Sequence, residues 1–361
     1  MRREDRAEEG FMREQRMAAV AVPSLLAGSL FLLLFAPDAG GGRNRQPPTP
    51  VPRVSIEFVV VDHPGNPDDP VDAICCGAAG DVFAPVHTEL GGVDYVYRLS
   101  KYEITWDQYA IFLNRVAWHS DPNGLFISYM EGERGGLIRS QNPNGTYKYT
   151  PKAGMADKPC GYMDFFRALR FVNWLHNGQP SGQQGPTTTE DGAYTLLGTN
   201  PDQPVRNPGV RFWLANEDEW YKAAFYDPDL GVYHDYPLGS DVKPTTDPPP
   251  GDQDASNTVF EHMSCPQFDP PPERVWISGL CQPTDVGAYP NAMSPFGVFD
   301  LCGNGIELTE SFLVHESEIH RVARGTYWNS DSIECRRDYR TSSLQECEGC
   351  FGYTFRVAAP Y

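Results

Sequence analysis

Apolar residues recur at helical spacing in three segments of the chain. Residues 105–118 (TWDQYAIFLNRVAW) open with Thr and Gln at the spacing of a capping box, followed by apolar positions on one helical face. Residues 164–176 (DFFRALRFVNWLH) repeat that facial pattern and stop before an Asn-Gly pair. Residues 216–226 begin with Asn-Glu-Asp-Glu, a second capping box. The pattern therefore predicts three helices with these bounds.

The rest of the chain is typical of short strands joined by turns. We expect strands at residues 93–99, 192–197 and 353–358, between segments rich in Gly, Pro and Asn. The 33 Pro and 34 Gly are spread along the chain without a repeat. The predicted class is α+β with little regular secondary structure, and residues 54–361 are expected to form one domain.

The N-terminal part has a different pattern. Residues 17–36 carry no charge, are mostly apolar and follow Arg13 and Arg16. This indicates a signal peptide or membrane anchor over residues 1–39, with a misjudged core helix as the third interpretation. Residues 40–53 are rich in Gly and Pro and are expected to be a linker. The domain is therefore predicted to lie outside the cytoplasm, in the periplasm or cell envelope or secreted, with possible anchorage through residues 17–36.

Charge and cysteine content narrow the possible partners and chemistry. The net charge is −19 with no basic block, which argues against nucleic acid as a partner. Nine cysteines in an exported chain predict disulfides with at least one thiol left over, although spacing leaves their pairing open. The Cys347-Glu-Gly-Cys350 pair favours a disulfide over zinc, since no second such pair or suitably spaced His pair is present.

Six segments in order resemble one known family. They are Tyr102-Glu103-Ile104-Thr105, RALRFVNWL at 167–175, WLANEDEWYKAA at 213–224, FGVFDLCGNGIELT at 296–309, RGTYW at 324–328 and FRVA at 355–358. Together they resemble the formylglycine-generating enzyme, or sulfatase-modifying factor, family. The resemblance implies a C-type-lectin-like fold over residues 54–361. The loop DHPGNPDD at 62–69 is similar to that of exported bacterial members.

The resemblance also implies a catalytic copper site, and this chain departs from it. Active members oxidise a sulfatase cysteine to formylglycine with copper(I) held by two thiolates, which are soft ligands suited to that ion. Here Asn329 stands at the first cysteine position and Thr326 replaces the serine of the preceding turn. The second position falls on Arg336, one residue after Cys335. We therefore expect no copper site.

Cys335 has three possible roles. It could be a buried core residue, a disulfide partner of Cys302, Cys347 or Cys350, or a reactive thiol that makes it a candidate catalytic residue.

A calcium site is the second feature that the resemblance implies. Family members hold the ion with a side-chain oxygen, two backbone carbonyls and a glutamate. The matching positions are Asp300, Gly303, Gly305 and Glu307. Hard oxygen ligands at Gly-rich backbone are what calcium requires, so we expect calcium here, with a turn satisfied by hydrogen bonds as the alternative.

Three functional hypotheses follow. The favoured one is a non-catalytic binding module that holds a peptide or glycan ligand, because the copper cysteine pair is not retained. The alternative is a formylglycine-generating oxidase, or a related oxidative enzyme that modifies a sulfatase cysteine. The third is a structural protein of the cell envelope.

Overall fold

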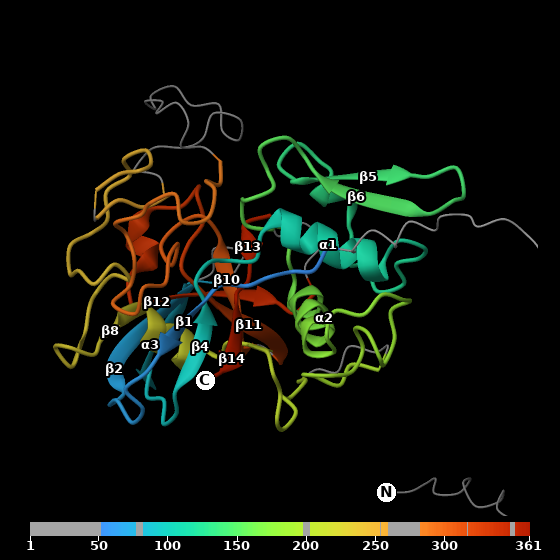
Figure 1. Ribbon diagram of the computed structural model, residues 1–361. Coiled ribbons are helices and arrows are strands. Elements are labelled where there is room, and N and C mark those ends of the chain that lie inside the picture. Colours follow the sequence, from blue (N-terminus) through green and yellow to red (C-terminus); the bar gives the residue numbers. More distant parts are fainter. Residues whose placement is uncertain are drawn as a thin grey trace, which may run out of the picture. The chain divides into compact units, whose positions relative to one another are not determined.

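The computed structural model describes residues 52–76, 82–197, 203–252, 254–258, 282–315, 317–346 and 351–361 (Figure 1). These residues contain three α-helices: α1 (Trp106–Val116), α2 (Phe165–His176) and α3 (Glu217–Phe225). They are the helices that the apolar pattern predicts, and their ends differ from the expected ones by no more than two residues.

Each helix begins after a capping residue that the sequence pattern had placed at the start of the predicted helix. Capping boxes form at Thr105 before α1 and at Asn216 before α3. Before α2, the carboxylate of Asp164 accepts the backbone N–H of Arg167 at 2.7 Å. These oxygens bind N–H groups that the first helical turn would otherwise leave without partners.

The strands form two main sheets and two hairpins. In one sheet the order is β1-β4-β14-β7, and in the other it is β13-β10-β11-β12-β2-β3. The hairpins are β5-β6 and β8-β9. The larger sheet is mixed, since β10 and β13, and likewise β12 and β2, pair in parallel. The strand bounds are β1 (Phe58–Val61), β2 (Asp69–Cys76), β3 (Val82–Leu90), β4 (Tyr97–Ser100), β5 (Leu137–Gln141), β6 (Tyr147–Pro151), β7 (Trp213–Leu214), β8 (Tyr226–Asp227), β9 (Val232–Tyr233), β10 (Ile306–His315), β11 (Glu318–Arg324), β12 (Tyr339–Leu344), β13 (Tyr353–Thr354) and β14 (Val357–Pro360).

Two of the expected strands are present in altered form. Residues 93–99 contribute only their final part to β4, because the carbonyl of Val93 accepts the N–H of Gly65 instead of continuing the sheet. Residues 353–358 are divided between β13 and β14, which belong to different sheets. A single apolar run in the sequence therefore serves two sheets.

The strand expected at residues 192–197 is wrong. The N–H groups of Leu196 and Leu197 both donate to the carbonyl of Glu190, at 2.7 and 2.9 Å. Extended backbone could not direct two successive N–H groups at one carbonyl, because its successive groups point to opposite sides. The segment instead turns back on itself beside α2.

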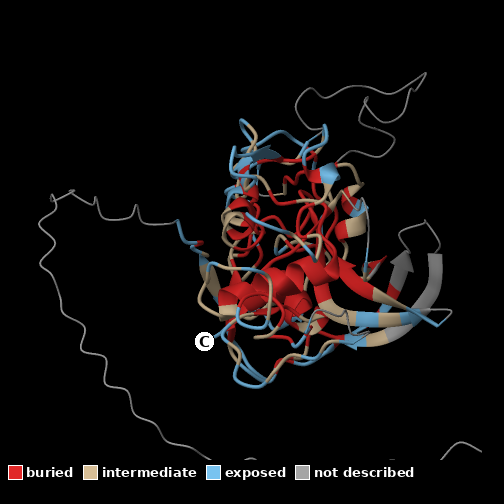
Figure 2. Ribbon diagram, turned by 90° about the vertical axis from the view of Figure 1, so that its right-hand side faces the viewer, coloured by how far each residue is buried: buried red, intermediate tan, exposed pale blue. Residues whose placement is uncertain are grey.

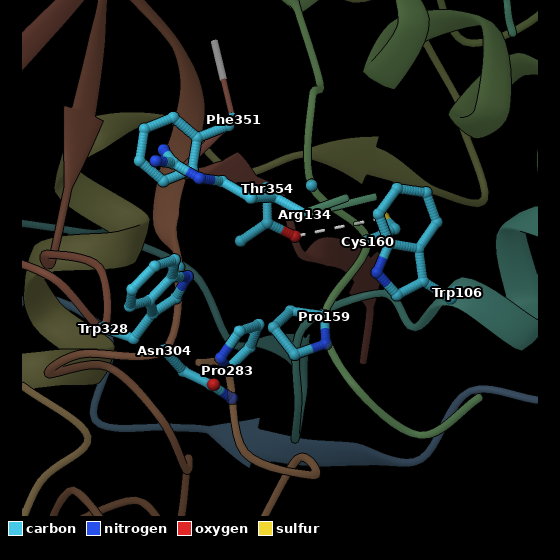
Figure 3. Close-up of a pocket in the computed structure, with 12 residues that line it drawn as sticks. Trp106, Arg134, Pro159, Cys160, Pro283, Asn304, Trp328, Phe351 and Thr354 are labelled. Carbon is cyan, nitrogen blue, oxygen red and sulfur yellow. Dashed lines mark hydrogen bonds between the residues drawn. The ribbon is translucent and has the colours of Figure 1, made fainter. Parts of the chain in front are cut away.

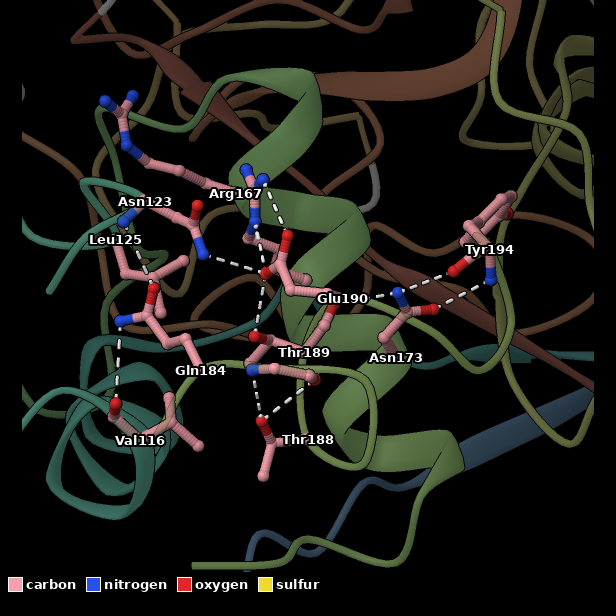
Figure 4. Close-up of polar contacts among 12 residues, drawn as sticks. Val116, Asn123, Leu125, Arg167, Asn173, Gln184, Thr188, Thr189, Glu190 and Tyr194 are labelled. Atoms are coloured by element: carbon pink, nitrogen blue, oxygen red, sulfur yellow. Dashed lines mark hydrogen bonds and ion pairs between the residues drawn. The ribbon is translucent and has the colours of Figure 1, made fainter. Parts of the chain in front are cut away.

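Helix α2 is buried on every side, and not only on the apolar face that its sequence indicates (Figure 2). Its polar residues bind the chain that follows it. Arg170 pairs with Glu190 through two contacts of 2.9 and 3.0 Å, and Asn173 donates to the carbonyls of Thr189 and Tyr194 (Figure 4). Buried polar groups are tolerated when they are hydrogen-bonded in this way.

No helix in the described ranges is both long and apolar enough to cross a bilayer. The apolar run at residues 17–36, the linker up to residue 51 and Cys265, Cys281, Cys347 and Cys350 lie outside the described residues. The predicted signal, anchor and pairing of those cysteines therefore stay predictions.

Candidate functional site

Seven separate segments of the chain meet around a narrow pocket of about 20 Å³ (Figure 3). Its wall combines three aromatic rings and two prolines with glycines and polar groups, among them one arginine and one thiol. The sequence patterns did not indicate this pocket. Its lining consists of Trp106, Arg134, Pro159, Cys160, Gly161, Pro283, Asn304, Gly305, Trp328, Phe351, Gly352 and Thr354.

Glycines allow the chain to pass close to the pocket walls. A Cβ on Gly136 would lie 2.3 Å from Nε1 of Trp106, and one on Gly305 would lie 2.5 Å from Cγ2 of Thr354. Both distances are far below a van der Waals contact, so neither position accepts a side chain without rearrangement. The backbone thus approaches the first residue of α1 and the end of β13 directly.

The pocket combines a cation with flat apolar surfaces. The guanidinium of Arg134 lies 4.7 Å from the ring centroid of Phe351, in a cation–π contact. The Phe351 ring also packs against Trp328, with centroids 5.9 Å apart. Burial lowers the pKa of Arg134, but a guanidinium keeps its charge at neutral pH. The pocket therefore offers a positive charge beside stacking surfaces.

The thiol in the pocket is not activated. Cys160 is fully buried, and its Sγ lies 4.0 Å from the hydroxyl of Thr354. Burial raises the pKa of the thiol well above its ordinary value. Because the thiolate is the nucleophile, Cys160 is unreactive at neutral pH in this arrangement.

The segment at the expected copper positions adjoins the pocket through Trp328. Cys335 forms a disulfide with Cys302, with Cα atoms 5.2 Å apart, which confirms one of its three alternative roles. Asn329 has a buried Oδ1 without a hydrogen-bond partner, and the hydroxyl of Thr326 donates to Glu334 at 3.2 Å. Neither Asn329 nor Cys335 presents a free thiolate, so the donor set does not fit copper(I).

Of the expected calcium residues, Asp300 precedes β10 and Glu307 lies within it, and Arg356 binds both the carbonyl of Phe299, next to Asp300, and the carboxylate of Glu307. The carboxylate of Glu307 accepts two N–H groups from Arg356 and the indole N–H of Trp220 at 2.7 Å. Oδ2 of Asp300 accepts the N–H of Gly287 at 2.7 Å. Both carboxylates are buried and keep further lone pairs for an ion.

The side chains of this loop do not by themselves complete a cation site. Within the described part of the chain, no three His, Cys, Asp or Glu side chains are placed to hold one ion together. An ion would therefore need backbone oxygens as well as Asp300 and Glu307, and the positions matched by resemblance, Gly303 and Gly305, supply carbonyls. A buried oxygen without a partner also lies next to the loop, on Glu103.

Comparison with known proteins assigns the family. A model of the sulfatase-modifying factor enzyme 1-like domain matches residues 85–359. The chain belongs to this family. The match confirms the resemblance carried by the six sequence segments, and with the mixed sheets and few helices it confirms the α+β class with little regular secondary structure.

Solved structures similar to this sulfatase-modifying-factor-like chain share little sequence with it. CarF is 13% identical and covers 85% of this chain and 99% of its own, with a TM-score of 0.45. Treponema denticola variable protein 1 is 14% identical over 87% and 98%, with a TM-score of 0.48. PvdO from Pseudomonas aeruginosa is 15% identical over 84% and 94%, with a TM-score of 0.45. A search of curated proteins found no match.

Sequence reasoning missed three residues of this sulfatase-modifying-factor-like domain. Glu103 lies inside one of the segments that carried the resemblance, so its motif was visible although its role was not. Cys160 was counted only as one of nine cysteines. Arg134 lies in an irregular loop before β5, where no periodicity or motif distinguishes it.

Proposed function

We propose that this sulfatase-modifying-factor-like protein is a non-catalytic binding module that acts outside the cytoplasm and holds a peptide or glycan in the pocket. The proposal rests on one observation, which is that the segment beside the pocket lacks two free thiols at the copper positions. Asn329 stands at one copper position, and Cys335 is tied to Cys302. The pocket thus lies next to a segment without the two thiolates that the oxidase would need.

The wall chemistry supports such a ligand. Phe351 is partly exposed and offers a ring that can stack on aromatic side chains, on proline and on the apolar faces of sugars, while the buried Trp106 and Trp328 line the rest of the wall. Arg134 adds donors for a carboxylate or carbonyl of the ligand. The pocket is narrow, at about 20 Å³, so it would hold one small group of the ligand while the rest of the ligand lies on the surface around it.

The proposal is tested by screening the purified domain against arrays of synthetic peptides and of glycans, and measuring affinity for the bound probes. We expect Arg134→Gln to weaken binding by about 10- to 150-fold, since charge-assisted hydrogen bonds contribute about 1.5–3 kcal/mol. Arg139→Gln is the matched control, because Arg139 also stacks on rings, 4.5 Å from Phe126 and 5.0 Å from Tyr147, but does not line the pocket.

Two results would contradict the proposal. One is that no peptide or glycan binds the folded domain. The other is that both arginine variants weaken binding equally, which would place the ligand elsewhere on the surface.

A further inference from the structure

The tip of the β5-β6 hairpin carries a reactive pair of residues that has no role in the pocket (Figure 1). Asn144 is exposed at this tip, and its Nδ2 has no hydrogen-bond partner among the described residues. Gly145 follows it with a φ of 82°, a left-handed conformation that favours glycine. Asparagine is a chemically labile residue, and a following glycine places no side chain in the way of an attack by its backbone nitrogen.

The hydrogen bonds of the tip favour such an attack. Thr146 donates its backbone N–H to Oδ1 of Asn144 at 3.1 Å and its hydroxyl to the same oxygen at 2.7 Å. Negative charge develops on Oδ1 when Cγ is attacked, and donors already directed at that oxygen stabilise it. The space around Gly145 is open, since a Cβ built on it would meet nothing within 4 Å.

We propose that Asn144 is a site of deamidation by the chain itself, assisted by the two donors of Thr146. The backbone nitrogen of Gly145 attacks Cγ of Asn144, and the bond from Cγ to Nδ2 breaks. Nδ2 takes the proton of the Gly145 N–H and leaves as ammonia. Water then opens the cyclic imide at either of its carbonyls, which leaves Asp or isoaspartate.

The balance of this reaction needs only water. An amide NH2 is replaced by OH, nothing is oxidised or reduced, and the hairpin tip gains one negative charge at neutral pH. The inference goes beyond the proposed function, because it concerns a covalent change of the chain and needs no ligand.

One hydrogen bond of the tip must open before the attack. The N–H of Gly145 donates to the carbonyl of Asn142 at 2.9 Å. The nitrogen becomes a nucleophile only after it has left this carbonyl and lost its proton. Exposed hairpin tips open locally at little cost, and hydroxide removes the proton, so the reaction should accelerate as the pH rises.

The chain has three other Asn-Gly pairs, and in each the fold holds the asparagine. Nδ2 of Asn123 donates to Glu190 at 2.9 Å. Nδ2 of Asn177 donates to two backbone carbonyls, at 3.0 and 2.8 Å. Asn304 is buried. Rotation of these side chains toward the next nitrogen would break such contacts, so the three pairs are internal controls.

The experiment incubates the folded protein at neutral and at alkaline pH and follows each Asn-Gly pair by peptide mapping and mass spectrometry. Asp and isoaspartate should accumulate at Asn144 faster by about tenfold or more than at the other three, because those react only when the fold around them opens. The rate at Asn144 should be higher at alkaline pH. In urea, where the fold no longer holds any of the four asparagines, their rates should become similar.

Substitutions of threonine test the assistance to the attack. Thr146→Val keeps the shape of the side chain and should slow the reaction by about 2- to 13-fold, the rate equivalent of one neutral hydrogen bond. Thr146→Ser keeps the hydroxyl and should react as wild type does. Thr150→Val is the matched control, since Thr150 is also exposed on this hairpin.

Two results would overturn the proposal. One is that Asn144 in the folded protein reacts no faster than the other Asn-Gly pairs. The other is that Thr146→Val reacts at least as fast as wild type and Thr150→Val.

Discussion

Glu217 at the start of α3 joins the two strands that flank the segment with Asn329 and Cys335. Its carboxylate is buried, and Oε1 accepts Nε of Arg324 from β11 and Nε of Arg340 from β12, each at 2.8 Å. Oε2 accepts Nη2 of Arg340, also at 2.8 Å. Glu217→Gln would keep the shape of the side chain but leave two buried guanidinium groups facing a neutral amide.

The expected cost follows from that arrangement. Removing one partner of a buried ion pair destabilises a protein by about 3–5 kcal/mol, because the remaining charge is left uncompensated. In a domain of this size each kcal/mol lowers the melting temperature by about 2 °C, so we expect a fall of about 6–10 °C.

The assay is urea unfolding followed by circular dichroism under non-reducing conditions, together with thermal melting. The control is Glu57→Gln, since Glu57 meets Lys101 at 2.7 Å on the surface with 61% of its side chain exposed. That variant should cost at most about 1 kcal/mol. An equally small loss for Glu217→Gln would refute the view that this charge cluster holds β11 and β12 against α3.

Four other outcomes are expected. Reducing the Cys302–Cys335 disulfide should lower the free energy of unfolding by about 3–4 kcal/mol, given its separation of 33 residues, and the loss caused by reductant should be smaller by that amount in Cys335→Ser than in wild type. Burial lowers the pKa of Lys222 to about 8, so between about pH 8 and 9.5 the unfolded chain binds more protons than the folded one. The free energy of unfolding of wild type should therefore rise over this range relative to that of Lys222→Met. If urea unfolding of the two proteins changes equally with pH, Lys222 is not buried. Incubation with copper and either wild type or Asn329→Cys should leave the sulfur of a Cys-x-Pro-x-Arg peptide in place, as measured by mass spectrometry. The reason is that Cys335 is bonded to Cys302 and Arg336 stands at the second copper position. Conversion of the peptide by wild type that disappears in Cys335→Ser would favour the oxidase instead. Intact mass of the protein from its native envelope should lack residues 1 to about 41, and an untrimmed chain in the cytoplasm would contradict export.

The sequence predicted those parts of the fold that depend on neighbours along the chain. Thr105 and Asn216 predict where α1 and α3 begin, because all residues of a capping box lie within four positions of the sequence. Residues 192–197 have a strand-like composition, but the N–H groups of Leu196 and Leu197 donate to the carbonyl of Glu190. No pattern within the segment predicts these hydrogen bonds. Likewise, the sequence alone predicts that Arg170 on α2 faces solvent, because it does not show that Glu190 lies beside it.

The candidate site was predictable only where a family motif covered it. Asp300, Glu307, Asn329 and Cys335 could be named by position, and the Cys302 pairing was one of several open alternatives. The pocket was not predictable, because its wall is assembled from side chains as distant as Trp106 and Phe351, and its one cation lies in a loop without a motif.

The place of β14 has a consequence for how the protein is made. This strand, which ends one residue before the last residue of the chain, lies inside its sheet, with β4 on one side and β7 on the other. The carbonyl of Pro360 also accepts Nε of Arg98, 262 residues earlier. A ribosome must therefore synthesise the chain beyond residue 360 before this sheet can close, and until then β4 and β7 expose edges that can pair with other strands. A truncation that removes β14 should therefore leave β4 and β7 without the strand that pairs with both of them and expose the chain to degradation.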